Sequence, residues 1–257
     1  MKRKRMNKSI IALIPARSGS KGVKNKNIRH LHGFELIAYS IAIAKLSKYI
    51  SRVIVSTDSE EIAEVARSYG AEVPFIRPER FATDDATDLS WIKHALEWLA
   101  TNEGDVADII VQLRPTTPYR EPKLVDEAIA HLLQSPHATS LRSAHKLDES
   151  PYKMFIKDDE YFKPFMQMDK SEFYNLPRQS FPQVYAPNGY IDILRTDHII
   201  TRSNLHGENI LAFETPIITE IDTEENLRDL EKEDCSLISY LMEQLQRSAL
   251  VRHLNQL

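Results

Sequence analysis

The sequence predicts an α/β protein with a mainly parallel sheet that is covered by helices on both faces. Three observations favour this fold class: short apolar runs end in polar loops, segments with helical spacing of apolar residues follow them, and the connections are short. Ligands bind at the carboxyl ends of the strands in such sheets, so the loops that follow the strands are the candidate sites.

The first apolar run, residues 9–15, has the length of a fully buried strand and ends at a proline. Apolar residues at helical spacing predict a helix over 36–50. The same alternation predicts strands at 52–58, 71–77 and 107–115, and helices near Ile62, Leu89 and Val125. The loops after these strands should gather along one edge of the sheet: 16–27 (the basic loop), 56–58, 77–88 and 114–120.

The alternation stops after residue 138. Residues 140–187 are richer in prolines, aromatic side chains and charges, which predicts an inserted subdomain or an arm that packs on another subunit. Strands resume at 190–195 and 208–215, and regularly spaced leucines predict a long closing helix over 227–245. We therefore expect a basic tail at residues 1–8 and a single domain over 9–257 that carries the insertion.

Bulk composition is that of an ordinary globular protein, with 42% hydrophobic and 27% charged residues. The net charge of -4 and the lack of a basic face argue against nucleic acid as a partner. No apolar run approaches the roughly 20 residues of a membrane span, and the run after the basic N-terminus is short for a secretory signal. The single cysteine, Cys235, rules out an internal disulfide and suits a reducing compartment. We expect a cytoplasmic protein with no membrane partner.

The basic loop is rich in cations but contains only two glycines. It matches neither standard phosphate loop: in a Walker A motif the lysine follows a glycine, whereas Lys21 precedes Gly22, and a dinucleotide fingerprint needs three glycines. A loop between a strand and a helix still offers backbone N–H groups to phosphate, to which Arg17 can add a bidentate fork and Lys26 a mobile charge. The pattern favours an anion site; a solvated basic loop is the alternative.

The loops after the second and third strands differ in character. Asp58, with Glu61 three residues on, has the spacing of an N-cap and its capping-box partner, and is interpreted as structural. Residues 76–88 combine two arginines, four acids and two threonines, a composition suited to a base: Thr87 or Asp88 can pair with the polar edge of a pyrimidine. A solvated loop that ends in the N-cap of the next helix is the alternative for this stretch.

A proline-punctuated segment, residues 176–193, holds Arg178, Gln179, Tyr185 and Asn188. Asn188 followed by a glycine is a turn signal before a strand. A guanidinium fork beside an amide suits a carboxylate and hydroxyl groups, which favours ligand recognition by Arg178 and Gln179.

Glu220 and Asp222 stand at i and i+2 on a predicted strand end. Period-two spacing points both carboxylates to the same face, where they repel unless a cation lies between them. Hard oxygen ligands suit Mg²⁺, which keeps waters and bridges phosphates, with Mn²⁺ as a substitute. Beside a basic loop the pair predicts a Mg²⁺–nucleotide site; alone it would be assigned to the capping of the last helix.

These stretches, in this order, resemble the cytidylyltransferases that activate sialic acids, the CMP-N-acylneuraminate synthetase family. The resemblance spans roughly residues 9–230, and IPARSGSKGVKNKN is its most specific element. Further similar blocks are IVSTDSEEIAEVA, VPFIRPERFATDDAT, LRPTTPYR, PRQSFPQVYAPNGYI and EIDTEENL. The resemblance implies a Rossmann-like nucleotidyltransferase core with a dimerisation arm near the sugar-acid site, and a homodimer or a dimer of dimers.

The resemblance also implies roles for individual residues. CTP would be held by Arg17, Ser18, Ser20, Lys21, Lys26 and Asn27, with cytosine read around Arg77, Ala86, Thr87 and Asp88. The sugar-acid side would be formed by Arg114, Thr116, Thr117, Arg178, Gln179, Tyr185 and Asn188, with Arg178 reaching in from a partner subunit. Glu220 and Asp222 would bind Mg²⁺, and the catalytic residues would be Arg17, Lys21 and Asp222.

Two departures from the family pattern bear on the acceptor and the metal. Arg114 stands where the family block usually has a glutamine that faces the sugar acid, so an acid more compact than N-acetylneuraminate, or differently substituted, is favoured. Glu220 stands where aspartate is typical, which keeps the charge and lengthens the arm, so metal binding should survive with altered geometry.

The expected reaction is nucleotidyl transfer, in which the anomeric 2-hydroxyl of a nonulosonic acid attacks the α-phosphate of CTP and releases pyrophosphate. Positioning and charge neutralisation should dominate, because little covalent chemistry is required of the protein. No histidine or cysteine presents itself as a general base. The alternatives are a nucleotidyltransferase for 3-deoxy-octulosonic acid or a sugar phosphate, and a non-catalytic nucleotide-binding homologue.

Overall fold

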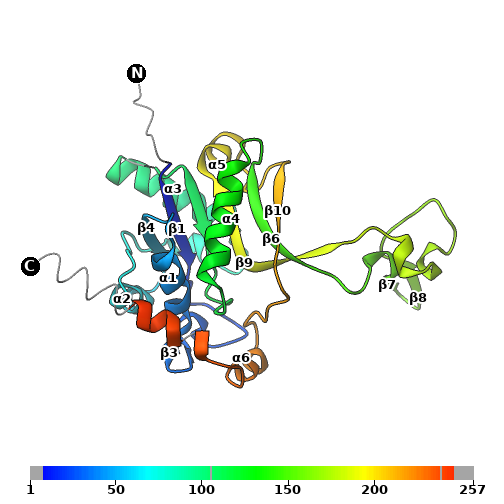
Figure 1. The fold of residues 1–257 in the computed structure, drawn as a ribbon, viewed down its shortest axis with the longest axis horizontal. Helices are drawn as coiled ribbons and strands as arrows, with labels where there is room; N and C mark the ends of the chain where they lie inside the picture. The colour runs from blue at the N-terminus through cyan, green and yellow to red at the C-terminus, as the bar shows by residue number, and fades with distance from the viewer. Residues whose placement is uncertain (1–7, 105, 238, 246–257) are drawn as a thin grey trace, which may run out of the picture.

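The computed structural model describes residues 8–245 apart from 105 and 238, so the predicted tail at 1–8 lies outside it except for Lys8. Its centre is a six-stranded sheet in the order β10-β6-β9-β5-β1-β4 (Figure 1). The strands are β1 (Ile10–Pro15), β4 (Arg52–Ser56), β5 (Ile109–Gln112), β6 (Ser140–Lys146), β9 (Tyr185–Arg195) and β10 (Ile210–Glu214). β1 is parallel to β4 and β5, and β6 to β10, whereas β9 is antiparallel to both its neighbours. The predicted α/β class with a mainly parallel sheet is confirmed.

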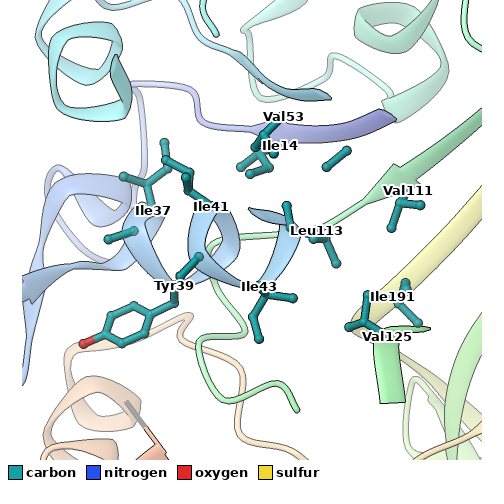
Figure 2. Close-up of a cluster of buried hydrophobic side chains, with 14 of the residues drawn as sticks. Ile14, Ile37, Tyr39, Ile41, Ile43, Val53, Val111, Leu113, Val125 and Ile191 are labelled. Carbon is teal, nitrogen blue, oxygen red and sulfur yellow. The ribbon is translucent and has the colours of Figure 1, made fainter. Parts of the chain in front are cut away.

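The two faces of the sheet are buried in two separate hydrophobic cores. The helices that close them are α1 (Leu36–Leu46), α2 (Glu60–Ser68) and α4 (Pro122–Gln134) on one face, and α3 (Asp88–Glu103) and α5 (Thr196–Arg202) on the other. Ala12 and Ile14 of β1 belong to the first core, part of which is seen in Figure 2, and Ile11 and Leu13 belong to the second. Because alternate side chains go to opposite cores, β1 reads as one continuous apolar run.

Two of the predicted elements, the third strand and the long closing helix, do not form as expected. Residues 71–77 are not a strand. They pair with the edge of the sheet at β4 only through two isolated bridges, because Pro74 between the bridges has no N–H to continue the ladder. The long closing helix is broken: α6 (Glu224–Leu230) ends, and helix resumes at residue 236. The Asp234 carboxylate accepts the N–H of Ser236 at 2.9 Å, a local side-chain bond that starts the second helical segment.

Short elements complete the described part of the chain. β2 (His30–Leu31) and β3 (Phe34–Glu35) form a small hairpin, whose turn residues His32 and Gly33 both have positive φ, 48° and 85°, as a tight hairpin turn requires. The 3₁₀ helices are η1 (Lys26–Ile28), η2 (Glu79–Phe81), η3 (Pro151–Lys153), η4 (Phe173–Asn175) and η5 (Arg178–Ser180).

An arm (residues 147–184) leaves the body between β6 and β9 and extends away from it (Figure 1). It lies inside the predicted 140–187 insertion; β6, at the start of that range, belongs to the main sheet. The arm carries the hairpin of β7 (Phe155–Asp158) and β8 (Tyr161–Pro164), in which the residues Tyr161 and Phe162 are each 72% exposed. Among the described helices, none is long and apolar enough to cross a membrane.

Candidate active site

A cavity of about 260 Å³ opens beside the carboxyl ends of β1 and β5. The predicted site residues that line it are Arg17, Ser20, Lys26, Asn27, Arg77, Ala86, Asp88, Arg114 and Thr116. Phe81, Thr83, Asp84 and Trp91 also line it, and no role was predicted for them. Three of the four predicted loops, 16–27, 77–88 and 114–120, therefore contribute to one cavity, although the stretch before 77–88 is not a strand.

The basic loop is anchored at both ends. Ser18 donates its N–H and its hydroxyl to the Asp58 carboxylate, at 2.8 and 2.7 Å. The Asn27 side chain, which is buried, donates to the carbonyl oxygen of Arg17 at 2.8 Å. The interpretation of Asp58 as an N-cap is wrong, because Ser59 caps α2. Asp58 instead fixes the loop that carries the cations.

The cations of the basic loop have carboxylate partners on two sides. Arg17 Nη1 lies 2.7 Å from one oxygen of Asp84, and the Lys21 ammonium pairs with the other oxygen. Hydrogen bonds hold the pKa of Asp84 below its ordinary value; the one from Lys21 has the larger effect and the one from Arg17 the smaller. Lys26 reaches in another direction, and its Nζ donates to Asp222 at 3.1 Å. The loop therefore bridges two acidic groups that lie on different segments.

Gly22 brings the basic loop into backbone contact with the segment that carries Asp222. A Cβ atom at position 22 would approach the carbonyl oxygen of Asp222 to well under 3.0 Å. Real Cβ atoms essentially never come this close to another heavy atom. A Cβ at Gly19, in the same loop, would meet nothing within 4 Å. The two glycines are therefore not equivalent: only Gly22 is required for a close approach.

The inner wall of the cavity is built on Arg77. Its Nε donates to Ser56 Oγ at 2.9 Å, its Nη1 donates to the Phe81 carbonyl at 3.4 Å, and its guanidinium lies over the Trp91 ring at 5.0 Å. Burial lowers the pKa of Arg77 to about 10. Thr87 caps α3, as the structural alternative for this stretch predicts. Phe81 and Trp91 thus place aromatic side chains in the wall of the cavity beside a buried cation.

Arg114 is held between two carboxylates. Its Nη2 donates to Asp88 at 2.5 Å and its Nη1 donates to Asp192 at 2.8 Å. Asp192 has a side chain that is 1% exposed, and Arg142 Nε approaches its second oxygen at 3.5 Å. Burial acts to raise the pKa of Asp88, but the charge of Arg114 and the hydrogen bonds that the carboxylate accepts together outweigh it, so the pKa lies below its ordinary value. The positive charge of Arg114 is compensated inside the protein.

Glu220 and Asp222 lie on an irregular segment, so the predicted strand end is wrong. The segment is held by the N–H of Ile221, which donates to the Thr116 carbonyl at 2.8 Å. Glu220 Oε1 accepts the N–H of Gly189 at 2.7 Å. A Cβ at Gly189 would lie 2.7 Å from Thr117 Oγ1 and 2.8 Å from Glu220 Oε2. The hydroxyl of Thr117 and the second carboxylate oxygen of Glu220 therefore both lie against Gly189.

The donor set at this edge fits a hard divalent cation. Thr117 Oγ1 is buried without a hydrogen-bond partner among the described residues, and Glu220 has a second oxygen beside it. Asp222 offers a carboxylate that is 71% exposed. Within the described chain, no three His, Cys, Asp or Glu side chains gather to hold a metal, so phosphate and water would complete the coordination, as Mg²⁺ prefers.

Arg120 is fully buried below this edge, a position that sequence reasoning missed. Its Nη2 donates to the carbonyls of Arg114 and Gly189 at 2.8 and 2.7 Å, and its Nε donates to the Tyr190 carbonyl at 2.5 Å. Its Nη1 donates to the Thr117 carbonyl. Burial lowers the pKa of Arg120 to about 9. One side chain thus joins the loop after β5 to the backbone that holds Glu220.

Arg120→Ala is expected to lower the free energy of unfolding by about 3 kcal/mol or more, because it leaves several buried carbonyls without donors. Denaturant unfolding followed by circular dichroism measures this. Arg228→Ala, at an exposed position of α6, is the matched control and should change it by less than about 0.5 kcal/mol. An equal, small effect for both variants would show that the Arg120 contacts contribute little.

The remaining predicted residues lie away from the cavity or are engaged elsewhere. Arg178 and Gln179 line a separate hollow of about 250 Å³ at the arm, where Arg178 lies 3.6 Å from Asp148. Tyr185 is exposed at the start of β9. The Asn188 side chain accepts from Ser143 Oγ at 2.7 Å and donates to Thr215 Oγ1 at 2.9 Å.

The family model described as cytidylyltransferase matches residues 11–246. The chain belongs to the cytidylyltransferase family. This cytidylyltransferase is 37% identical over 209 residues to N-acylneuraminate cytidylyltransferase of Escherichia coli O18:K1:H7, a match that covers 81% of the chain and 47% of that relative. The chain therefore spans about half the length of this relative.

A second relative matches along most of its length. The chain is 32% identical to CMP-N,N'-diacetyllegionaminic acid synthase of Campylobacter jejuni, covering 85% of this chain and 91% of the relative. Among solved structures, CMP:2-keto-3-deoxy-manno-octonic acid synthetase complexed with CTP superimposes with a TM-score of 0.64 at 18% identity, over 87% of this chain and 97% of that one. At that identity the likeness shows the shared fold.

Proposed function

We propose that this cytidylyltransferase transfers the cytidylyl group of CTP to the anomeric 2-hydroxyl of a nonulosonic acid and releases pyrophosphate. The contact of Lys26 with Asp222 carries the proposal, because through it the basic loop and the acidic segment touch each other. The relatives named for N-acylneuraminate and for N,N'-diacetyllegionaminic acid support this class of acceptor.

The base and the triphosphate of CTP would each meet a different part of the site. Phe81 and Trp91 would flank the base, while Arg77, buried and already hydrogen-bonded, fixes the wall rather than the ligand. The triphosphate would lie along the basic loop, whose Arg17 and Lys21 supply charge. Such an arrangement stabilises a leaving pyrophosphate by charges that are already in place.

Glu220 and Asp222 would hold Mg²⁺, which supplies charge neutralisation at the phosphates when it is bound. In the transfer, the 2-hydroxyl oxygen forms a bond to the α-phosphorus as the bond to the bridging oxygen breaks. Pyrophosphate leaves with the bonding electron pair, and the hydroxyl proton passes to solvent. Lys26, paired with Asp222, holds the basic loop against the acidic segment during this exchange.

Arg114 bears on the choice of acceptor through its size. Both of its terminal nitrogens are engaged by Asp88 and Asp192, so its charge is not free for the carboxylate of the acceptor. It still fills more space than the glutamine usual in the family block. A smaller or differently substituted nonulosonic acid than N-acetylneuraminate is therefore favoured.

The arm would serve the acceptor side in a second subunit. Arg178 and Gln179 lie outside the cavity of their own chain, and the arm bears exposed aromatic side chains. We expect a homodimer in which each arm covers the partner's site. Sedimentation as a monomer at assay concentrations would contradict this arrangement.

The reaction is tested by pyrophosphate release with CTP, UTP, ATP and GTP against a panel of acceptors. The panel contains N-acetylneuraminate, diacetyllegionaminic and pseudaminic acids, 3-deoxy-octulosonic acid and a hexose phosphate. Release should require CTP and a nonulosonic acid, with the CMP-sugar identified by mass. Activity confined to 3-deoxy-octulosonic acid or to a sugar phosphate would overturn the acceptor class, and no activity with any pair would favour a non-catalytic homologue.

A further inference from the structure

We propose that Asp84 is an internal counter-ion of the phosphate site: its carboxylate neutralises Arg17 and Lys21 in the ligand-free protein and leaves them when a polyphosphate binds. The identity of that polyphosphate as CTP rests on the proposed function. The exchange itself rests on the geometry of three side chains.

One carboxylate engages both cations that face the phosphate position. Arg17 Nη1 lies 2.7 Å from Asp84 Oδ1, and the Lys21 ammonium pairs with Oδ2. Arg17 and Asp84 both line the cavity, whereas Lys21, with a side chain that is 82% exposed, is drawn to it by this contact. The carboxylate therefore stands where phosphate oxygens would meet the same two cations.

Asp88 and Asp192 have further structural contacts that Asp84 lacks. Asp192 is buried against Arg114, and Asp88 at the start of α3 binds both Arg114 and the Trp91 indole N–H. Asp84 is 37% exposed, lies in the irregular stretch between η2 and α3, and does not cap α3. Its carboxylate can turn towards solvent without breaking an element of the fold.

The exchange would weaken the binding of CTP and of pyrophosphate by the same factor, and so promote product release. Any anion that binds Arg17 and Lys21 must first break their two ion pairs with Asp84, so the free energy of binding is reduced by the same amount for every anion. CTP makes additional contacts through its base and ribose, so it binds in spite of this cost. Pyrophosphate lacks these contacts, so the return of Asp84 promotes its release after transfer. Asp84 thus acts on binding and product release, with no part in the bond changes.

The experiment is calorimetric titration of the full chain with inorganic pyrophosphate in metal-free buffer. Asp84→Asn should lower the Kd for pyrophosphate about fivefold, the size expected when two partly exposed ion pairs no longer compete. The control is Asp85→Asn, an exposed neighbour with the same change of charge, which should shift the Kd less than about twofold. Asp84→Glu retains the charge and should bind pyrophosphate like the parent protein.

Three results would overturn the proposal. The first is an unchanged Kd for pyrophosphate in Asp84→Asn, and the second is equal tightening in the Asp85→Asn control, which would reduce the effect to general electrostatics. Weaker binding of pyrophosphate by Asp84→Asn, only when Mg²⁺ is added, would make Asp84 a metal ligand instead. Thermal unfolding of each variant verifies that the fold is retained. Since no acceptor is present, failure of the transfer assay leaves this measurement valid.

Discussion

Asp222→Asn is expected to lower turnover by about 100- to 1,000-fold, the size typical for loss of one preorganised charge contact in a transition state. Asparagine keeps the shape of the side chain and an oxygen that can still accept from Lys26 Nζ, so the loop should stay in place. The negative charge that would bind Mg²⁺ is lost. Binding of CTP should be partly retained, because the cations of the basic loop remain.

Initial rates of pyrophosphate release at saturating CTP, over a titration of Mg²⁺, measure this effect. Glu225→Gln is the matched control: it removes one exposed acid from the first turn of α6, three residues further on. It should change turnover less than about twofold. Near-normal turnover of Asp222→Asn at saturating Mg²⁺ would remove Asp222 from the metal site.

Gly22→Ala is expected to reduce kcat/KM by about 100-fold, the cost of a misplacement of about 1 Å in a positioned site. The new Cβ would collide with the backbone carbonyl of Asp222, and neither partner is a flexible side chain that can turn away. The basic loop and the acidic segment must therefore separate, which alters the contact of Lys26 with Asp222. Steady-state kinetics together with calorimetric binding of CTP measure the loss.

Gly19→Ala is the control for this variant, since it adds the same methyl group to the same loop where nothing lies within 4 Å. It should leave kcat/KM within about twofold of the parent value, because open space accommodates the methyl group. Equal losses for the two variants would mean that loop flexibility, rather than the close approach, is what alanine disturbs.

The fold class was predictable because a strand that is buried on both faces has apolar residues at successive positions of the sequence. β1 reads as an unbroken apolar run since its alternate residues enter two cores. The failure at residues 71–77 has a local cause: the stretch looks like a strand, but Pro74 cannot donate a ladder hydrogen bond. At the break before Ser236, the Asp234 carboxylate accepts hydrogen bonds from the N–H and the hydroxyl of Ser236, and the spacing of the leucines gives no sign of these local bonds.

The site was predictable where chemistry is concentrated in one loop, and less so where it depends on contacts between distant residues. The cations of the basic loop stand together in the chain, but their pairing with Asp84 spans more than 60 positions. Asp192, an acid within an apolar strand, was a readable signal of a buried ion pair with Arg114. Arg120 gave no signal, since nothing in its neighbourhood distinguishes a fully buried arginine from an exposed one.

The contact between the basic loop and Asp222 also orders events during synthesis. Lys26 and Asp222 are 196 positions apart, so at about 5 to 20 residues per second roughly 10 to 40 s pass between their emergence from the peptidyl transferase centre. For that interval the nascent chain has the cationic half of the site and lacks its acidic half. A chain released just before Asp222 is added would contain all six strands of the sheet, since β10 ends at Glu214, and would still lack a complete site.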